Sequence, residues 1–256
     1  MAPVTISALA LSAGMAVAAG LVGCFAVMRR MTLAADAISH VALPGVALAI
    51  ILKLHPIVGA LAMLAVGAVL IWMLETRTGI STETITGVVF SVALAVGAMM
   101  SSGEELLEAL FGGPGTLTNL ELVAGLLGAA AVIGFILVAR NALLVSLVSP
   151  EIALTSGINV SRLNLLYLLT FALTVALGLR YLGVLLMGSL IIIPAATARR
   201  LAHSLNGMFV CATVVAVTST VIGSWAAAST GRESGPFIIT IAGALFFLSL
   251  LRPSRA

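Results

Sequence analysis

The sequence predicts an all-α protein: a polytopic bundle of about eight or nine membrane-spanning helices with one short helix outside the membrane. Three observations predict this class. Of the 256 residues, 61% are hydrophobic and 8% are charged, whereas a soluble domain carries roughly a quarter charged residues. Eight long runs contain no Asp, Glu, Lys or Arg. These runs also lack the alternation of polar and apolar residues that is typical of membrane β-strands.

The candidate spans follow one another along the whole chain. The charge-free runs cover residues 1–28, 54–74, 84–103, 122–139, 163–179, 181–198, 201–231 and 234–251. Each is near or above the roughly 20 residues that a helix needs to cross about 30 Å of hydrocarbon. Segment 31–52, interrupted only by Asp36 and His40, is a ninth candidate, and the count falls to eight if this segment re-enters the membrane from one side. We therefore expect a single transmembrane domain over residues 1–256.

The basic residues indicate the orientation. With nine spans and the N-terminus outside, nine Arg residues fall on the cytoplasmic side and three basic residues, Lys53, Arg180 and Arg232, fall outside. This is the positive-inside bias of membrane proteins. The net charge of +3 therefore reflects topology in contact with lipid, and we expect no binding of nucleic acid.

The first polar feature inside a predicted span is the pair Asp36 and His40. Asp36 is the single Asp of the chain, and side chains at i and i+4 of a helix project from the same face. A carboxylate in an apolar span is costly and by default marks a functional site. Carboxylate plus imidazole suits zinc, manganese or ferrous iron. Alternatively, the two side chains form a structural pair near the cytoplasmic end, in which they are hydrogen-bonded to each other and to Ser39.

Helix-disrupting residues follow this pair. Pro44 and Gly45 are expected to bend or break the helix and to free backbone carbonyls, as happens at ion sites in transporters. Pro194, in the run 181–198, is expected to supply a second fixed bend. Two ligands do not complete a coordination shell, because zinc usually takes four and manganese prefers six. A second copy of the chain, related by a two-fold axis, could bring two such pairs together.

A polar break at residues 149–157 is the second feature. Ser149 suits a helix N-cap, Pro150 the first helical position and Glu151 the positive end of the helix dipole, and Gly157 suits the C-terminus. These residues predict a helix of about two turns on the cytoplasmic side. Because so short a helix has little stability alone, we expect it to dock against a partner. The alternative is a plain surface connector.

Three stretches together resemble the integral membrane permease of the ABC-3 family, the bacterial zinc, manganese and iron importers. Residues 36–45 read Asp-Ala-Ile-Ser-His-Val-Ala-Leu-Pro-Gly, similar to the family's Asp-x-x-Ser-His-x-x-Leu-Pro-Gly pattern. The pattern Glu151-x-Ala153-x-x-x-Gly157 resembles the E-x-A-x-x-x-G loop by which importer permeases bind their ATPase subunits. Residues 183–198 are similar to a late family helix rich in Leu, Ile, Pro and Ala.

The resemblance covers essentially the whole chain and implies a function. It implies that Asp36 and His40 contact the transported metal and that residues 150–157 form the coupling helix, with Glu151, Ala153 and Gly157 as its motif. It implies three partners in the bacterial cytoplasmic membrane or beside it: an ATP-binding-cassette ATPase, a metal-binding solute-binding protein and a second permease copy. The coupling motif lacks the Ile-x-Leu-Pro that follows it in the fuller importer version.

The chain itself is not expected to be an enzyme. Its single Lys, Lys53, has no Gly-rich context, so the P-loop that ATP hydrolysis would require is absent from the sequence. A separate subunit would therefore have to supply ATP hydrolysis. One alternative function is a proton-coupled secondary carrier with Asp36 and His40 as a proton relay, which would leave residues 150–157 without a role. An intramembrane enzyme ranks last, since the sequence has no H-E-x-x-H.

Overall fold

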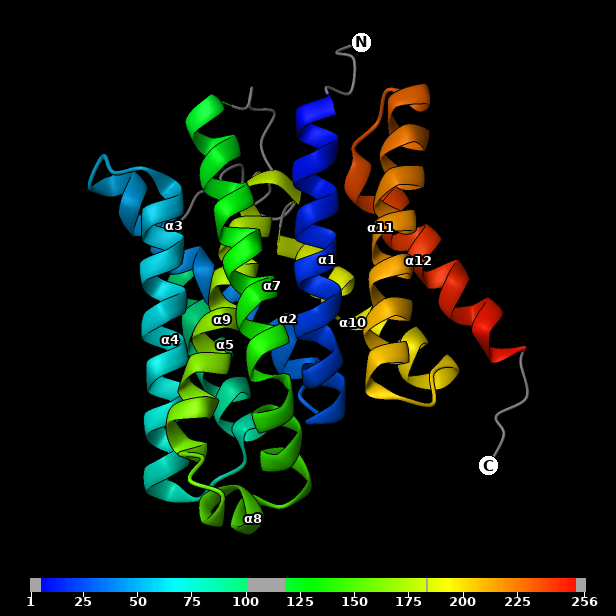
Figure 1. Cartoon of the computed structure of the whole chain (residues 1–256). Coiled ribbons are helices and arrows are strands. Elements are labelled where there is room, and N and C mark those ends of the chain that lie inside the picture. Colours follow the sequence, from blue (N-terminus) through cyan, green and yellow to red (C-terminus); the bar gives the residue numbers. More distant parts are fainter. Residues whose placement is uncertain (1–5, 101–117, 183, 252–256) are drawn as a thin grey trace.

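The computed structural model of the chain describes residues 6–100, 118–182 and 184–251, and all regular elements in these ranges are α-helices. Figure 1 shows them as one bundle. The helices are α1 (Ile6–Met28), α2 (Thr32–His40), α3 (Ala42–Ile51), α4 (Pro56–Thr78), α5 (Thr82–Met100), α7 (Asn119–Val148), α8 (Pro150–Thr155), α9 (Val160–Leu182), α10 (Val184–Leu201), α11 (Leu205–Thr230) and α12 (Ser234–Leu250). The predicted polytopic helical bundle is thereby confirmed.

The helices run back and forth along one axis. Within the described ranges, six of them, namely α1, α4, α5, α7, α9 and α11, are long and apolar enough to cross a membrane. Figure 1 shows α1, α4 and α7 running from the end of the bundle near the N-terminus toward the end that carries α8. Because α4 begins at the end opposite to where α1 stops, α2 and α3 together connect the two ends. Segment 31–52 is therefore a broken crossing of the bundle and does not return to the side from which it starts.

Small residues allow the central helix α1 to approach its neighbours closely. A Cβ atom added at Gly23 would lie 1.9 Å from the carbonyl oxygen of Ile191 in α10, and one added at Gly20 would lie 3.2 Å from that of Ala212 in α11. Further along α1, the ring of Phe25 packs edge-on against those of Tyr167 and Phe209. Backbone contact through small residues is the usual way in which membrane helices associate without a hydrophobic drive.

The crossing between α1 and α4 breaks at Val41, which separates α2 from α3. This is three residues before Pro44, which lies in the first turn of α3 together with Gly45. The physical reason is that Pro44 has no N–H to donate to the carbonyl four residues back, which belongs to His40. Gly45 is a packing contact, because an added Cβ would lie 2.3 Å from the carbonyl oxygen of Gly59 in α4. The break thus ends α2 at the candidate ligand His40.

Pro194 is buried inside α10, which continues as one helix from Val184 to Leu201. Its missing N–H leaves the carbonyl of Leu190 without the usual helical donor. The predicted bend at Pro194 stays a prediction.

Candidate functional site

The helix α2 packs among six other helices of the described bundle. It contacts α5 and α10 extensively and also touches α1, α3, α4 and α9. Ile38 and Ser39 on this helix are buried. A ten-residue sequence pattern could not predict that one short helix is enclosed by six others, and this enclosure gives α2 a position from which it can affect the whole bundle.

His40 is the last residue of α2. Its ring lies 5.5 Å, centroid to centroid, from that of Phe90 in α5. Its Nδ1 atom is buried and has no hydrogen-bond partner among the described residues. Buried polar atoms are nearly always satisfied, and an exception calls for an explanation such as an absent ligand. The imidazole therefore has a nitrogen available for a cation.

Asp36 lies in α2, four residues before His40, but its side chain is outside the described part of the molecule. The helix places the two residues one turn apart on the same face. Among the described side chains, no group of three or more His, Cys, Asp or Glu is close enough to hold a metal ion. A complete metal shell therefore needs Asp36 or groups beyond those described.

The helix α8 has the caps that the sequence predicts. The Ser149 side chain accepts a hydrogen bond from the backbone N–H of Ile152, and Pro150 is the first helical residue. At the other end Gly157 has φ +77°, a left-handed conformation that favours glycine. Its N–H donates to the carbonyl of Leu154, while that of Ile158 donates to Ala153, which is the Schellman pattern of helix ends. The short helix is thus closed at both ends by local bonds.

The surface of α8 divides into two parts. Ala153 is fully buried, and the helix packs on α7 and α9. Glu151 is exposed, and Ile152 and Leu154 are about 60% exposed. Large apolar side chains displayed next to a carboxylate on a protruding element are typical of a contact surface for another protein. Of the predicted motif, Glu151 therefore lies on the outer face, Ala153 anchors the helix, and Gly157 closes it.

An open cavity of about 750 Å³ lies beside α8 at the same end of the bundle. Its wall is built from the α1–α2 link, the α4–α5 link, the junction of α7 with α8 and the first turns of α9. Its lining includes two Arg, two Glu, three Ser, two Thr and one Asn beside apolar side chains, and we call it the polar cavity for these groups. Pro150 and Leu154 of α8 line this cavity, and so does Met31, which directly precedes α2.

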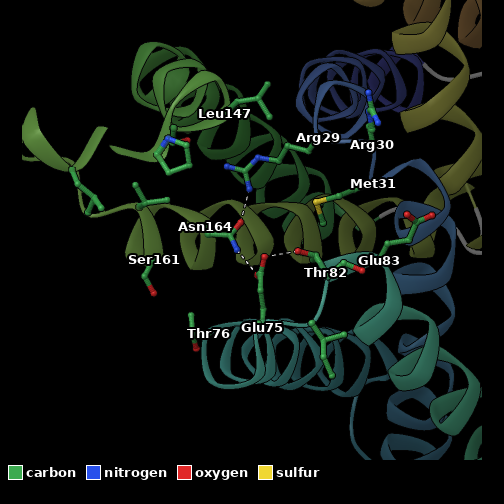
Figure 2. Close-up of a pocket in the computed structure, with 17 residues that line it drawn as sticks. Arg29, Arg30, Met31, Glu75, Thr76, Thr82, Glu83, Leu147, Ser161 and Asn164 are labelled. Atoms are coloured by element: carbon green, nitrogen blue, oxygen red, sulfur yellow. Dashed lines mark hydrogen bonds between the residues drawn. The ribbon is translucent and has the colours of Figure 1, made fainter. Parts of the chain in front are cut away.

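A hydrogen-bonded chain of side chains crosses this cavity (Figure 2). Arg29 Nη1 donates to Asn164 Oδ1. Asn164 Nδ2 donates to Glu75 Oε2 at 2.6 Å, and Thr82 Oγ1 donates to Glu75 Oε1 at 2.5 Å. The Arg29 guanidinium also lies 4.6 Å from the centre of the Tyr167 ring. These side chains, which we call the Glu75 network, connect α4, α5 and α9 with the residue that follows α1.

Arg29 is held as a cation within the protein. Burial lowers the pKa of its guanidinium from the ordinary value, an effect that Tyr167 and Glu75 oppose. An arginine nevertheless stays protonated in proteins, and its charge is partly compensated by the Tyr167 ring and by the Glu75 carboxylate beyond Asn164. The neighbouring Arg30 has φ +60°, a conformation that costs energy for a residue with a Cβ. The turn from α1 into α2 is therefore both charged and strained.

The Glu75 network is not predictable from the sequence. Arg29 and Asn164 are 135 positions apart, and Asn164 and Glu75 are 89 apart, so no local pattern connects them. The one available signal was an isolated polar residue, Asn164, within the first turns of a predicted apolar helix.

This bundle of apolar helices has a buried His40 nitrogen without a hydrogen-bond partner among the described residues and a polar cavity open at one end. It has the build of a multi-pass membrane permease. Comparison with known proteins defines the class further. The model of the ABC 3 transport family matches residues 1–253. The chain is 32% identical over 238 residues to the high-affinity zinc uptake system membrane protein ZnuB of Haemophilus influenzae, covering 91% of each chain.

Two further comparisons agree. The manganese transport system membrane protein MntC of Listeria monocytogenes is 29% identical, with coverage of 95% of this chain and 89% of MntC. The solved structure of PsaBC from Streptococcus pneumoniae in complex with Fab superposes with a TM-score of 0.82 at 29% identity, covering 95% of this chain and 90% of that one. The chain belongs to the ABC 3 transport family. It is a permease subunit of an ATP-binding-cassette transporter, a multi-pass protein of the bacterial cytoplasmic membrane.

Proposed function

We propose that this permease imports a divalent transition-metal ion, zinc, manganese or ferrous iron, by alternating access, and that Asp36 and His40 contact the ion during passage. The relatives named as zinc uptake and manganese transport proteins support this substrate class. Ligand type does not choose among these ions, since selectivity depends on geometry and availability.

The observation that carries the proposal is the buried Nδ1 atom of His40, which has no hydrogen-bond partner among the described residues. It lies at the break between α2 and α3, where Pro44 removes the donor to the His40 carbonyl. Imidazole nitrogen, carboxylate and backbone carbonyl are all ligands that divalent metals accept. A moving ion needs few ligands at a time, because a complete, rigid shell would hold it too tightly for release.

A separate ATPase subunit supplies the energy in this proposal, and it binds the exposed face of α8 through Glu151, Ile152 and Leu154. In this proposal a shift of α8 is passed to α2 through α9, which packs against both helices and carries Asn164 of the Glu75 network. Rigid shifts of helices at an interface are a common form of switching. The break before Pro44 and the bend predicted at Pro194 would give this movement fixed points.

Three further partners complete the proposed assembly. A metal-binding solute-binding protein delivers the ion at the end of the bundle opposite to α8. A second copy of the permease pairs with the first, as two-fold symmetry is the commonest arrangement of oligomers, and membrane lipid covers the remaining apolar faces.

The test is metal uptake by the purified transporter in liposomes. The permease, its ATPase and its solute-binding protein are reconstituted, and ATP-dependent uptake of Zn²⁺ and Mn²⁺ is followed with a metal-sensitive dye inside the vesicles. We expect Asp36→Asn and His40→Ala each to lower the uptake rate at least about tenfold, because one lost ligand contact is worth on the order of 1.4 kcal/mol or more.

A matched control is His55→Ala, which removes an exposed His at the start of α4. This variant should transport within about twofold of the unaltered protein. Normal ATP-dependent uptake by both the Asp36 and the His40 variants would contradict the assignment of the ion contact. Uptake that follows a proton gradient without ATP would instead support a secondary carrier, which membership of the ABC 3 transport family does not favour.

A further inference from the structure

A second cavity, of about 470 Å³, lies at the α8 end of the bundle. Its floor is the end of α1, and its walls are the last turns of α7 and the link between α10 and α11; the helices α7 and α11 both pack against α1 (Figure 1). We call it the basic cavity, and its lining is Met28, Leu144, Leu147, Val148, Arg199, Ala202, His203, Ser204, Leu205 and Met208.

The charge around this cavity is of one sign. Arg199 and His203 line it, and no acidic residue is among its described lining residues. Arg140 lies next to the cavity, one turn before the lining Leu144, and its Nη1 donates to Oδ1 of Asn206 at 3.2 Å, one residue after the lining Leu205. Ser204 caps the N-terminus of α11 by accepting from the N–H of Gly207, and a helix N-terminus adds partial positive charge. The cavity therefore attracts an anion.

Arg199 is held in place by one hydrogen bond, and other N–H donors of its guanidinium are available for a ligand. Its Nη1 donates to the carbonyl oxygen of Val27 at 2.8 Å, which holds the side chain against the end of α1. A guanidinium has five N–H donors, so one bond leaves four for a ligand in the cavity. A planar fork of donors matches the oxygens of a phosphate group.

The cavity lies at the ends of two candidate membrane spans. The helix α1 ends at Met28 and α11 begins at Leu205, and both residues line the cavity. Arg140 lies eight residues before the end of α7, which is about 12 Å at 1.5 Å per residue. Since membrane spans end near the headgroup region, we infer that these cationic groups lie near that depth. The lining side chains between them, such as Leu144 and Met208, are apolar.

We propose that the basic cavity binds the phosphate headgroup of an anionic phospholipid of the cytoplasmic leaflet, with an acyl chain along its apolar wall. Arg199 and Arg140 hold the phosphate, and the Leu and Met side chains contact the chain. Basic pockets between membrane helices on the cytoplasmic side bind such headgroups. A free phosphate ion would use the basic groups alone and would leave the apolar wall without a function.

The test is lipid retention by the full-length permease in detergent, measured by native mass spectrometry with added phosphatidylglycerol or phosphatidylcholine. The unaltered protein should retain phosphatidylglycerol several-fold better. Arg199→Gln and Arg140→Gln should each lower the apparent affinity for phosphatidylglycerol roughly fivefold, as one basic group near the surface contributes about that much. Arg199→Lys keeps the charge and should retain more lipid than Arg199→Gln, and Arg140→Gln leaves the bond to Val27 intact.

The matched control is Arg162→Gln, which removes an exposed Arg at the start of α9 on the same side of the bundle and should leave retention unchanged. Equal retention of both lipids, or equal loss in the Arg162 variant, would overturn the proposal. Displacement of the lipid by millimolar inorganic phosphate would overturn it in favour of a soluble anion site, and loss of retention on addition of the ATPase would assign the cavity to the subunit interface. None of these outcomes depends on metal transport, so the two proposals fail separately.

Discussion

Glu75 connects three helices at the cytoplasmic end of the bundle. Its two carboxylate oxygens accept hydrogen bonds from different helices, one from Asn164 in α9 and one from Thr82 in α5. Bonds to an ionised acceptor are shorter and about twice as strong as neutral ones. The carboxylate also lies near Arg29, whose positive charge it helps to compensate. A single side chain thereby holds three helices in register around the polar cavity.

Replacing Glu75 with Gln should loosen this end of the bundle. The amide keeps the shape but loses the charge, so both hydrogen bonds weaken and Arg29 loses part of its compensation. We expect the free energy of unfolding to fall by about 1–2 kcal/mol, below the range for fully buried charged bonds because Glu75 is only half-buried. Thermal unfolding of the purified protein measures this. Glu83→Gln, an exposed carboxylate in the wall of the same cavity, should change it by less than about 0.5 kcal/mol, and equal effects would refute the role of Glu75.

Only its backbone conformation, and no contact of a side chain, requires a glycine at position 157. At φ +77° no atom lies within 4 Å of a Cβ built there, so Gly157→Ala introduces left-handed strain without a steric clash. The expected cost is roughly 1–2 kcal/mol, concentrated in the last turn of α8. Amide hydrogen exchange at Gly157 and Ile158 should become faster while the core of the bundle is unaffected. Gly157→Asn should restore part of the protection, because Asn tolerates this conformation better than Ala; identical exchange in both variants would rule out backbone strain as the cause.

At the level of elements, the sequence predicts best those features that depend on neighbouring residues. The caps of α8 were predictable, since Ser149, Pro150 and Gly157 act within one or two turns. The break near Pro44 was predictable as well, but its position at Val41 was not, because the missing bond lies four residues back, at the carbonyl of His40. The Glu75 network was out of reach, as its members come together only when α1, α4, α5 and α9 pack.

The contact between α3 and α4 shows how packing decides the role of a glycine. Gly45 was predicted to bend a helix, yet it lies against Gly59, and a Cβ added at Gly59 would lie 2.1 Å from the carbonyl oxygen of Gly45. Such a contact needs a second helix at a specific distance, which the pattern along one helix does not contain. The two glycines let the second half of the broken crossing lie directly on α4.

Gly59→Ala should separate these two helices. The added methyl group meets backbone, which cannot rotate away, and overpacking of this kind costs typically 1–3 kcal/mol. The control is Gly87→Ala in α5, where nothing lies within 4 Å of the added Cβ and where Ala is expected to stabilise the helix by about 0.5–1 kcal/mol. Thermal unfolding in detergent compares them. A decrease of equal size in both variants would contradict the contact with Gly45 as the cause.

At the scale of the whole molecule, charge and fold agree on the orientation. Near α8, Arg29 lies in the link after α1, Arg77 and Arg199 come just before links, and Arg162 comes just after one. Lys53 and Arg232 lie in links at the other end. The positive-inside rule therefore places α8 on the cytoplasmic side, where a soluble ATPase could reach it. The sequence contained most of this information, because topology depends on the order of spans and charges. It left open whether segment 31–52 crosses the membrane, and the structure shows that α2 and α3 together cross the bundle.

Labelling of introduced cysteines tests this orientation directly. Ser81 lies in the link between α4 and α5 and Ser229 near the end of α11, and both are exposed. With a membrane-impermeant maleimide, Ser81→Cys should react in inside-out vesicles and Ser229→Cys in right-side-out ones. The unaltered chain is the control, because Cys24 is buried and Cys211 half-buried within the apolar spans α1 and α11, so both should react little from either side. Reaction of the two introduced cysteines from the same side would contradict the alternation of helices between them. Reaction of Ser81→Cys in right-side-out vesicles and of Ser229→Cys in inside-out vesicles would place α8 outside, where no ATPase could bind it.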